Sequence, residues 1–354
     1  MNNPLQDLLE ERGVLMADGA TGTNLFSAGL QTGDAPELWN IDHPDRITTL
    51  HQNFIDAGSD IILTNTFGGT SYRLNLHNAG HRVTELNVAA AQIAKQCANA
   101  ADKKVLVAGS MGPTGEILEP NGPVSIDQAR AAFNEQALAL KEGGADILWI
   151  ETISSAEEIE AAVLGCADVG LPIVYTVSID TNGRTMMGLT AADTVRISTS
   201  LNTHISAVGT NCGVGASEVV AAVLNLSSAA DSLGVKPALV AKANCGIPEY
   251  IDGKVVYNGT PELMAKYAQL SIDAGANIIG GCCGTSPEHL KAMRAAIDSH
   301  QKTTAPELSG IESALGEVSV GAKAQLGGDL SVAGGSASGR GSRVSKRRRK
   351  TSSD

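Results

Sequence analysis

The chain has 354 residues, a net charge of −12 and 43% hydrophobic residues. This length is enough for one large domain with a sizeable core, and the acidic balance argues against nucleic acid as the partner of that domain. The sequence contains no uninterrupted apolar run of about 18 residues, so we expect no membrane span. The acidic N-terminus does not read as a secretory signal, and a cytoplasmic location is the default expectation.

Short apolar runs alternate with amphipathic or alanine-rich stretches from residue 1 to about residue 301. Such runs, often β-branched, are typical of parallel strands buried on both faces. We expect strands over Val14–Met16, Asp60–Leu63, Lys104–Ala108, Asp146–Ile150, Pro172–Val177, Ile205–Val208, Ala238–Ala241 and Asn277–Ile279. We expect helices over Ile47–Ala57, Val83–Ala98, Ile126–Glu142, Ala156–Asp168, Ala191–Leu201, Ser217–Ser232, Pro261–Asp273 and Pro287–Ser299. Eight strand–helix repeats predict a (βα)8 barrel of the TIM type.

Three junctions between a predicted helix and the next strand have similar sequences. Gly58, Gly144 and Gly275 each stand where a helix would end in a left-handed cap. The repetition favours one barrel over two separate domains. The alternative, an open doubly wound sheet, usually carries a G-x-G-x-x-G sequence after its first strand, and the segment Asp18–Thr23 lacks that spacing.

The composition changes near Ala305, beyond which Gly, Ser and Ala prevail and the basic run Lys346–Lys350 follows. Such a segment buries too little apolar surface to offset its ordering entropy. We therefore expect a barrel over residues 1–305 and a disordered tail over residues 306–354, whose deletion would leave fold and activity nearly intact. Two interpretations of the basic run stay open: contact with RNA or an acidic membrane surface, or a solubilising role without a partner.

Polar residues or thiols stand at the C-terminal ends of the predicted strands, where barrel enzymes carry their reactive groups. In chain order these are Asp18, Asn65, Ser110, Glu151, Ser178, Asn211–Cys212, Asn244–Cys245 and Cys282–Cys283. Cys212, Cys282 and Cys283 would converge at one mouth of the barrel. Three thiols form a soft donor set for Zn²⁺ and leave a fourth position open for a substrate thiol. Coordination would deprotonate that thiol and make it a nucleophile at neutral pH.

These residues admit other interpretations. Cys282 and Cys283 could form a strained disulfide or be unrelated thiols, although we expect reduced cysteines in a chain without an export signal. Cys245 is either a fourth ligand or a neighbour of the site. Asp18 and Glu151 could hold a substrate ammonium group, act as acid and base, or cap a turn. The glycine-containing loop after the first acid offers N–H groups to a carboxylate, so the rim suits an amino-acid substrate.

Six segments resemble the homocysteine S-methyltransferase family, in the same order, from about residue 13 to residue 298. They are Asp18–Thr23, Thr64–Phe67, Gly112–Gly115, Trp149–Thr152, Asn211–Gly213 and Gly280–Thr285. The Gly-Gly-Cys-Cys-Gly-Thr sequence with an upstream Asn-Cys is highly specific. The resemblance implies a Zn²⁺ ion bound by Cys212, Cys282 and Cys283.

The resemblance also assigns the substrate contacts. It implies that Asp18 and Glu151 contact the amino group of homocysteine, and that amides near Gly19 and Ala20 receive its carboxylate. The implied reaction is methyl transfer to the homocysteine sulfur, which gives methionine. A non-enzymatic binding protein is disfavoured because all three thiols and both acids are present. Whether the chain forms a homo-oligomer stays open.

The methyl donors of the family include betaine, S-methylmethionine and methyl-cobalamin. The chain is most similar to short bacterial betaine–homocysteine methyltransferases, so we expect betaine first, with S-methylmethionine or a separate methyl-corrinoid protein as the alternative. Animal betaine enzymes enclose the trimethylammonium group with aromatic residues, and at two matching places this chain has Gly68 and Thr152. Other rings would then be needed. Trp39, Phe67 and Tyr72 lie on suitable loops, where packing is an equally good interpretation.

Overall fold

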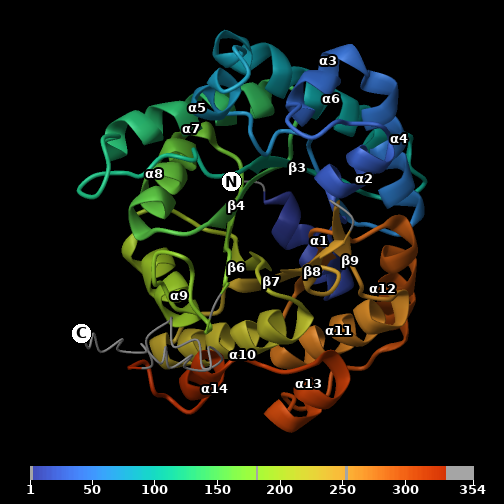
Figure 1. Ribbon diagram of the computed structural model, residues 1–354, viewed down its shortest axis with the longest axis vertical. Coiled ribbons are helices and arrows are strands. Elements are labelled where there is room, and N and C mark those ends of the chain that lie inside the picture. The colour runs from blue at the N-terminus through green and yellow to red at the C-terminus, as the bar shows by residue number, and fades with distance from the viewer. Residues whose placement is uncertain (1–2, 181, 252–253, 332–354) are drawn as a thin grey trace, which may run out of the picture.

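Parallel strands enclosed by helices form a (βα)8 barrel, which confirms the predicted fold (Figure 1). The computed structural model describes residues 3–180, 182–251 and 254–331, and within these residues the central sheet has eight strands. They are β1 (Leu15–Met16), β2 (Ile61–Leu63), β3 (Leu106–Met111), β4 (Ile147–Ile153), β5 (Ile173–Val177), β6 (Ala207–Cys212), β7 (Ala238–Ala243) and β10 (Ile278–Gly281). The order β1-β10-β7-β6-β5-β4-β3-β2 places β1 and β2 at the two edges, and a parallel bridge between Ala17 and Ile61 joins them.

Each predicted apolar run overlaps one of the barrel strands. The main difference lies at the C-terminal ends, because β3, β4 and β6 extend further than predicted. Ser110, Glu151 and Cys212 therefore belong to strands rather than to the loops that follow them. The ladder hydrogen bonds of the sheet hold the backbone of these residues, which fixes the direction of their side chains.

The helices that cover the barrel also agree with the predicted ranges. They are α4 (Pro44–Asp56), α6 (Val83–Ala100), α7 (Ile126–Glu142), α8 (Ala156–Cys166), α9 (Ala191–Ser200), α10 (Ala216–Leu233), α11 (Pro261–Ala274) and α12 (Pro287–Ser299). Gly58, Gly144 and Gly275 have φ values of 105°, 100° and 115°. The three left-handed helix ends are thus confirmed.

Shorter elements lie in the loops. They are α2 (Thr21–Ser27), η1 (Pro36–Leu38), α3 (Trp39–Asp42), α5 (Ser71–Asn75), η2 (Gly80–Arg82) and η3 (Ala167–Val169). An antiparallel hairpin of β8 (Pro248–Ile251) and β9 (Lys254–Tyr257) follows β7 and was not predicted. In Figure 1 the hairpin lies inside the ring of helices.

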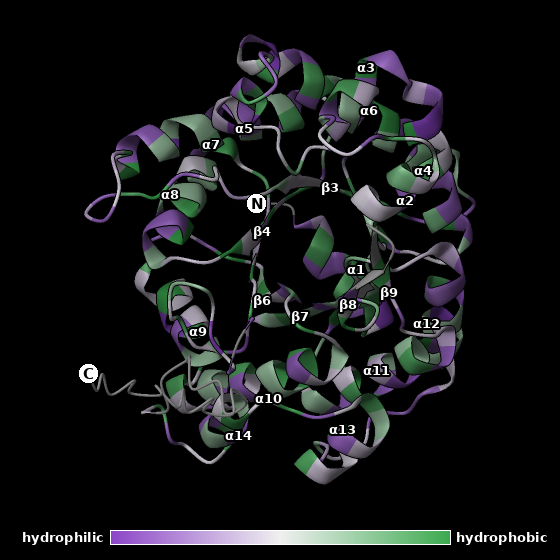
Figure 2. Ribbon diagram, viewed as in Figure 1, coloured by the Kyte–Doolittle hydropathy of each residue, from purple (hydrophilic) through white to green (hydrophobic). Residues whose placement is uncertain are grey.

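Hydrophobic side chains fill the lower part of the barrel. This cluster contains Trp149 and Val240 from the strands, together with Leu5 and Leu8 of α1 (Pro4–Arg12). The first helix therefore packs its apolar face against the interior of the barrel. A larger cluster lies between the strands and the outer helices, and Figure 2 shows the mixed polar and apolar faces of those helices. None of the described helices is both long and apolar enough to cross a membrane.

The side chains that point into the barrel change from apolar to polar along the strands. Residues two apart on a strand share one face. Trp149 is therefore followed on the inner face by Glu151, and Val240 is followed by Lys242. The lower layer supplies a hydrophobic core, and the upper layer supplies a charged one. This change places the candidate site at the C-terminal end of the barrel.

The segment after the barrel corrects the prediction of disorder from residue 306. Helices α13 (Leu308–Leu315) and α14 (Val320–Leu326) pack against α10, and α13 also contacts α11 (Figure 1). Ile311, Val318 and Ala322 are buried in this contact. A few well-placed apolar residues thus order the segment, because α10 already presents a matching surface. The rest of the predicted tail, residues 332–354 with the basic run, lies outside the described residues.

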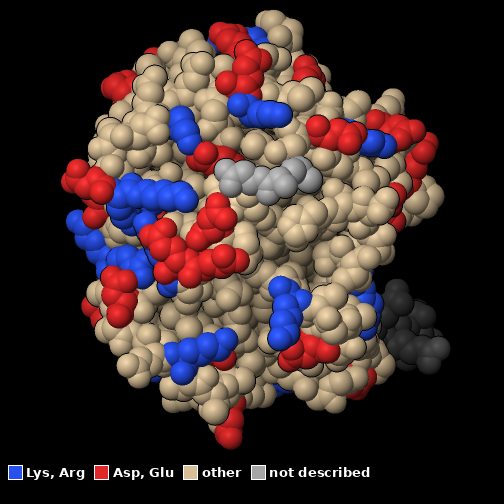
Figure 3. Space-filling model, turned by 180° about the vertical axis from the view of Figure 1, so that it is seen from behind, with Lys and Arg blue, Asp and Glu red and all other residues tan. Residues whose placement is uncertain are grey.

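The face opposite to that of Figure 1 carries acidic and basic side chains side by side (Figure 3). Among the ion pairs of the protein, the buried carboxylate of Asp60 pairs with Arg12, Lys103 and Arg294. Asp60 also accepts the backbone N–H of Met16 at 2.9 Å. These contacts tie the first strand to the second and to α12. We assign this cluster to the structural closure of the barrel.

Candidate active site

The thiols of Cys212, Cys282 and Cys283 meet at the mouth of the barrel. Their sulfur atoms all lie within 4.8 Å of one another. The Sγ of Cys212 is 2.9 Å from that of Cys282 and 3.9 Å from that of Cys283. A disulfide has an S–S distance of about 2.05 Å, and all six cysteines are free. The structure therefore brings together the three predicted residues as thiols and does not support a bond between the adjacent pair.

Backbone geometry sets the directions of these thiols. Cys212 ends β6 with a φ of 58°, in the left-handed region that few non-glycine residues adopt. Cys282 donates its N–H to the carbonyl of Ala243 at 2.7 Å. Cys283 donates its N–H to Oδ1 of Asn244 at 3.0 Å. The Cys282–Cys283 turn is therefore held against the end of β7, and only Cys212 needs an unusual backbone conformation.

The thiol cluster favours a thiolate. Hydrogen bonds from Cys212 and Cys282 lower the pKa of Cys283 well below its ordinary value. The side chain of Tyr257, at the end of the β8–β9 hairpin, also lowers the pKa of Cys283. A thiolate with two further thiols beside it is a ready set of soft ligands.

Cys245 does not join this cluster. Its side chain is buried, and its Sγ lies 3.3 Å from the carbonyl oxygen of Gly259. Its backbone N–H donates to the carbonyl of Cys283 at 2.8 Å. Cys245 thus supports the turn that carries two of the clustered thiols and lies outside the group of three.

Glu151 lies beside the thiols on the inner face of β4. Its Oε1 accepts a hydrogen bond from the hydroxyl of Ser110 at 2.5 Å. Burial raises the pKa of Glu151 to about 7, although Lys242 acts to lower it. The side chain retains 8% exposure, so it can still meet a ligand that enters the mouth.

Asp18 belongs to the same charged cluster but lies deeper, with 0% exposure. Its Oδ1 accepts from Nζ of Lys242 at 2.9 Å, and its Oδ2 accepts from the backbone N–H of Leu63 at 2.7 Å. Burial raises the pKa of Asp18, and the neighbouring ammonium group opposes that change. The structure thus brings Asp18 and Glu151 together, but only Glu151 reaches solvent.

Lys242 is a site residue that the sequence analysis missed. Burial disfavours its charge, but Asp18 and Glu151 together raise the pKa of Lys242 above its ordinary value. Its ammonium group also lies 5.7 Å from the centre of the Trp149 ring. A signal existed in the sequence: a lone lysine inside the apolar run of β7 has no place in a barrel unless acids face it.

The loop after Asp18 is partly engaged by the protein itself. Ala20 donates its N–H to the carbonyl of Thr285 at 3.2 Å. Gly19 packs so closely on Thr285 that a Cβ atom would lie 2.7 Å from the same carbonyl oxygen. Helix α2 begins at Thr21, directly after Ala20. The tight contact explains why a glycine follows Asp18, and it leaves one of the two predicted amides with a partner inside the protein.

Comparisons with known proteins agree with this geometry. The homocysteine S-methyltransferase family model matches residues 15–297. The chain belongs to this family. Methionine synthase of Mycobacterium tuberculosis is 31% identical over 310 residues, which cover 83% of this chain. Methionine synthase of Mycobacterium leprae is 30% identical over 319 residues and 85% of this chain. The chain spans about a quarter of the length of these curated relatives.

Solved structures of the family share the fold. The metallated form of the homocysteine methyltransferase MmuM from Escherichia coli has a TM-score of 0.68 and 25% identity, and the match covers 83% of this chain and 99% of that one. The oxidised form of the same protein has a TM-score of 0.69 and 26% identity. The matched region of the family model ends before α13, so α13 and α14 lie beyond the part of the chain that defines the family.

The aromatic residues expected at the donor side differ in their surroundings. Trp39 is only 7% exposed, and the guanidinium of Arg46 lies 4.6 Å from its ring centre. Tyr72 packs against the large core. Phe67 is 39% exposed and follows β2 at the barrel mouth. Of the three rings, Phe67 therefore has a free surface at the mouth, whereas Trp39 and Tyr72 have packing roles.

The two positions that depart from animal betaine enzymes have local explanations. Gly68 donates its N–H to Oε1 of the buried Glu37, and a Cβ there would lie 2.9 Å from that oxygen. Thr152 has a φ of 64° and exchanges hydrogen bonds with the side chain of Asn211. The Nδ2 of Asn211 lies 3.9 Å from Sγ of Cys282. Thr152 thus connects the strand of Glu151 with the thiols rather than lining a cation pocket.

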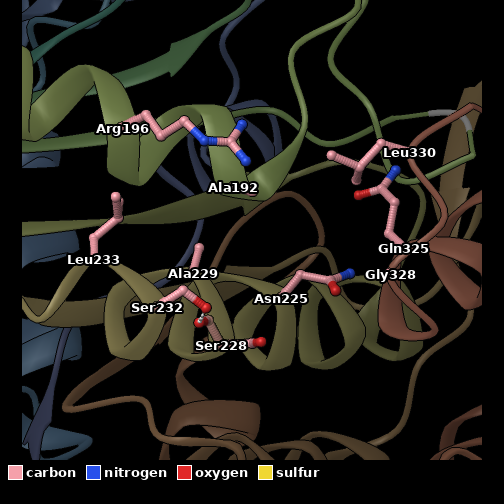
Figure 4. A pocket seen from close by; sticks show the side chains of 10 residues that line it. All are labelled: Ala192, Arg196, Asn225, Ser228, Ala229, Ser232, Leu233, Gln325, Gly328 and Leu330. Carbon is pink, nitrogen blue, oxygen red and sulfur yellow. Dashed lines mark hydrogen bonds between the residues drawn. The ribbon is translucent and has the colours of Figure 1, made fainter.

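A cavity on the outer surface is separate from this site (Figure 4). It is lined by residues of α9, α10 and the C-terminal segment, among them Arg196, Asn225 and Gln325. These elements lie on the outside of the barrel, whereas the thiols lie at its mouth. The cavity marks the boundary between the family fold and the segment that contains α13 and α14.

Proposed function

We propose that this protein is a zinc-dependent methyltransferase that transfers a methyl group from a small onium donor, with betaine first, to the sulfur of homocysteine. The observation that carries the proposal is the cluster of Cys212, Cys282 and Cys283 beside the acid Glu151. A set of soft donors next to a carboxylate suits a ligand that has a thiol and an ammonium group. Homocysteine has both.

The thiol cluster fits a zinc ion. Tetrahedral coordination with Zn–S bonds of about 2.3 Å needs S···S distances of about 3.8 Å. The 3.9 Å between Cys212 and Cys283 meets this requirement, and Cys282 would move away from Cys212 by less than about 1 Å. When bound, Zn²⁺ would lower the pKa of the substrate thiol and so supply a thiolate at neutral pH.

Glu151 would hold the ammonium group of homocysteine directly. It is the acid of the cluster with access to the mouth, and Ser110 fixes its orientation. Asp18 would act one layer deeper, by keeping Lys242 charged and in place. When both carboxyl groups are ionised, they and Lys242 leave a net negative charge of one, which the incoming ammonium group neutralises.

The methyl transfer is a displacement at carbon. A bond forms between the homocysteine sulfur and the methyl carbon while the bond from that carbon to the onium nitrogen breaks, and the electron pair stays on nitrogen. A thiolate and a cation thus give a thioether and a neutral amine. This loss of charge is favoured where water is scarce, and the buried upper layer of the barrel supplies such an environment.

Phe67 is the ring we assign to the onium group. Its carbonyl accepts the N–H of Gly112 at 2.9 Å, and a Cβ at Gly112 would lie 2.7 Å from the ring. The ring is thereby seated next to the strand that carries Ser110. An aromatic face contributes about 0.5–2 kcal/mol to binding of a cation. This contribution would replace part of the aromatic enclosure found in animal betaine enzymes.

A separate methyl-corrinoid protein is the second candidate donor. The observation that favours it is a set of exposed apolar side chains on loops that follow the barrel strands: Phe67, Ile117, Met186, Met187, Val214 and Ile247. These loops share one end of the barrel with the thiols. Exposed apolar groups around a site suit a protein partner that covers it.

Methionine formation with purified protein distinguishes the three donors: betaine, S-methylmethionine and a methyl-corrinoid protein. We expect turnover with homocysteine and betaine alone, and less or none with S-methylmethionine. If no small onium donor is active and turnover requires a methyl-corrinoid protein, the second candidate replaces betaine as the donor. No methionine from any of the three donors would refute the proposed activity.

A further inference from the structure

We propose that the C-terminal segment Leu308–Leu326 is a brace that positions the proposed zinc ligand Cys212. This inference rests on the proposed function and adds to it a part of the chain beyond the family match. Cys212 is the one of the three thiols that needs a left-handed backbone conformation, with a φ of 58°. Such a conformation persists only where the surroundings hold it in place.

The loop that carries Cys212 is fixed on two sides. On one side, Gly213 packs against Ile179, the second residue after β5, so that a Cβ at Gly213 would lie 2.1 Å from the carbonyl oxygen of Ile179. On the other side, the loop ends at Gly215, and α10 begins at Ala216. Any movement of the β5–α9 loop or of the start of α10 would therefore be passed to Cys212.

The C-terminal segment binds the start of α10. Glu218, the third residue of that helix, is buried and accepts hydrogen bonds from the backbone N–H and the hydroxyl of Ser319. The hydroxyl of Ser217 donates to the carbonyl of Glu317 at 3.0 Å. These contacts lie five and six residues after Cys212, on the first turn of the helix that follows it.

The same segment binds the β5–α9 loop. The Nε2 of Gln325 donates to the carbonyls of Gly183 and Asn182, at 3.0 and 3.3 Å. Gly321 packs directly on Asn182, where a Cβ would lie 2.3 Å from its carbonyl oxygen. The second residue of this loop is Ile179, whose carbonyl lies against Gly213. Both supports of the Cys212 loop thus lead to one segment, whereas the backbone N–H groups of Cys282 and Cys283 bond to Ala243 and Asn244, at the end of β7.

The test compares Glu218→Ala with a matched control in the full-length protein. Glu158 is also the third residue of its helix, is buried, and accepts the backbone N–H and the hydroxyl of Thr114 at 2.8 and 2.7 Å. Both substitutions remove a buried acceptor from a Ser or Thr, so both should lower the melting temperature. Only the substitution at Glu218 should affect Cys212.

The first measurement is alkylation of each cysteine by iodoacetamide in the metal-free protein, followed by peptide mass spectrometry. We expect Glu218→Ala to raise the rate at Cys212 several-fold relative to Cys283, and Glu218→Gln, which keeps an acceptor, to restore most of the wild-type ratio. Gln325→Ala, a milder change on the other support, should raise the same ratio. An unchanged ratio in all these variants overturns the brace, even if they melt early.

The second measurement is the zinc dissociation constant, by competition with a chromophoric chelator. Partners that orient a ligand typically change metal affinity by about 10- to 100-fold. We expect zinc to bind about tenfold more weakly to Glu218→Ala than to the wild type, and the affinity of Glu158→Ala to be unchanged. If the wild-type protein bound no zinc but Cys212 labelling still rose, the brace would stand and the proposed metal function would fall. Equal zinc affinity in wild type and Glu218→Ala would overturn the brace alone.

Discussion

Replacing Glu151 with glutamine should make the protein more stable and a poorer enzyme. The pKa of Glu151 is about 7 in the folded protein, against an ordinary value of 4.5. A carboxyl whose pKa is raised by folding destabilises the fold as it ionises, so this loss begins above about pH 4.5 and is complete above about pH 7. This raised pKa lowers the free energy of unfolding by about 3 kcal/mol at about pH 8 and by about 1 kcal/mol at about pH 5. Glutamine keeps the acceptor for Ser110 without the charge.

The assay is denaturant unfolding of the metal-free wild type and variant at both pH values. We expect the stability advantage of Glu151→Gln to grow with pH. The variant should also raise the KM for homocysteine by about ten- to hundredfold, because a charged hydrogen bond is lost, while zinc content stays the same. In the wild type, kcat/KM for homocysteine should rise with pH up to about 7, and the variant should lack this dependence.

Glu158→Gln is the control for this prediction. Burial also raises the pKa of Glu158, but it lies on α8 and faces Thr114 rather than the mouth. The KM of Glu158→Gln for homocysteine should equal that of the wild type. The reasoning is refuted if Glu151→Gln is less stable than the wild type at alkaline pH, or if its KM is unchanged.

Further predictions follow from the same site. Cys282→Ala and Cys283→Ala should lose most of the bound zinc in elemental analysis, while Cys245→Ala keeps it; full zinc in the first two variants would exclude them as ligands. Lys242→Met should lower the free energy of unfolding by about 3–5 kcal/mol because it leaves Asp18 buried and unpaired. The double variant with Asp18→Asn should recover part of this loss, and no recovery would argue against the ion pair. Phe67→Ala should raise the KM for betaine more than that for homocysteine, whereas Trp39→Ala should mainly lower the melting temperature; the opposite pattern would move the donor side to Trp39.

The barrel and its thiol cluster could be predicted because their signals are local. Each strand is a short apolar run, and Cys212, Cys282 and Cys283 directly end such runs. The family motif Gly280–Thr285, with Asn211–Cys212 upstream, also contains these three cysteines. These features need no knowledge of how distant side chains pack, which is why the strands, the helices and the convergence of the thiols agree with the structure.

The charged layer was harder to predict because it depends on which side chains face each other. The sequence predicted that Asp18 contacts the substrate, but it did not reveal that Lys242 on β7, two strands away from β1 in the sheet, pairs with Asp18. That pairing links residues 224 positions apart, and sequence spacing alone does not reveal it. Similarly, Trp39 and Phe67 both occur on mouth loops, and only packing distinguishes a covered ring from an open one.

The C-terminal segment was misjudged for the opposite reason. Its composition is poor in large apolar residues, which is typical of disorder. Composition does not report a complementary surface elsewhere in the chain, and α10 supplies one through Glu218 and its apolar neighbours. A segment that cannot fold by itself can thus be ordered by docking.

X-ray absorption at the zinc edge of the purified protein tests the central claim most directly, because it counts the sulfur atoms around the metal. We expect three sulfur neighbours at about 2.3 Å in the protein alone and four after homocysteine is added. Three sulfurs that do not change with homocysteine, or a metal bound mainly by nitrogen and oxygen, would contradict the account.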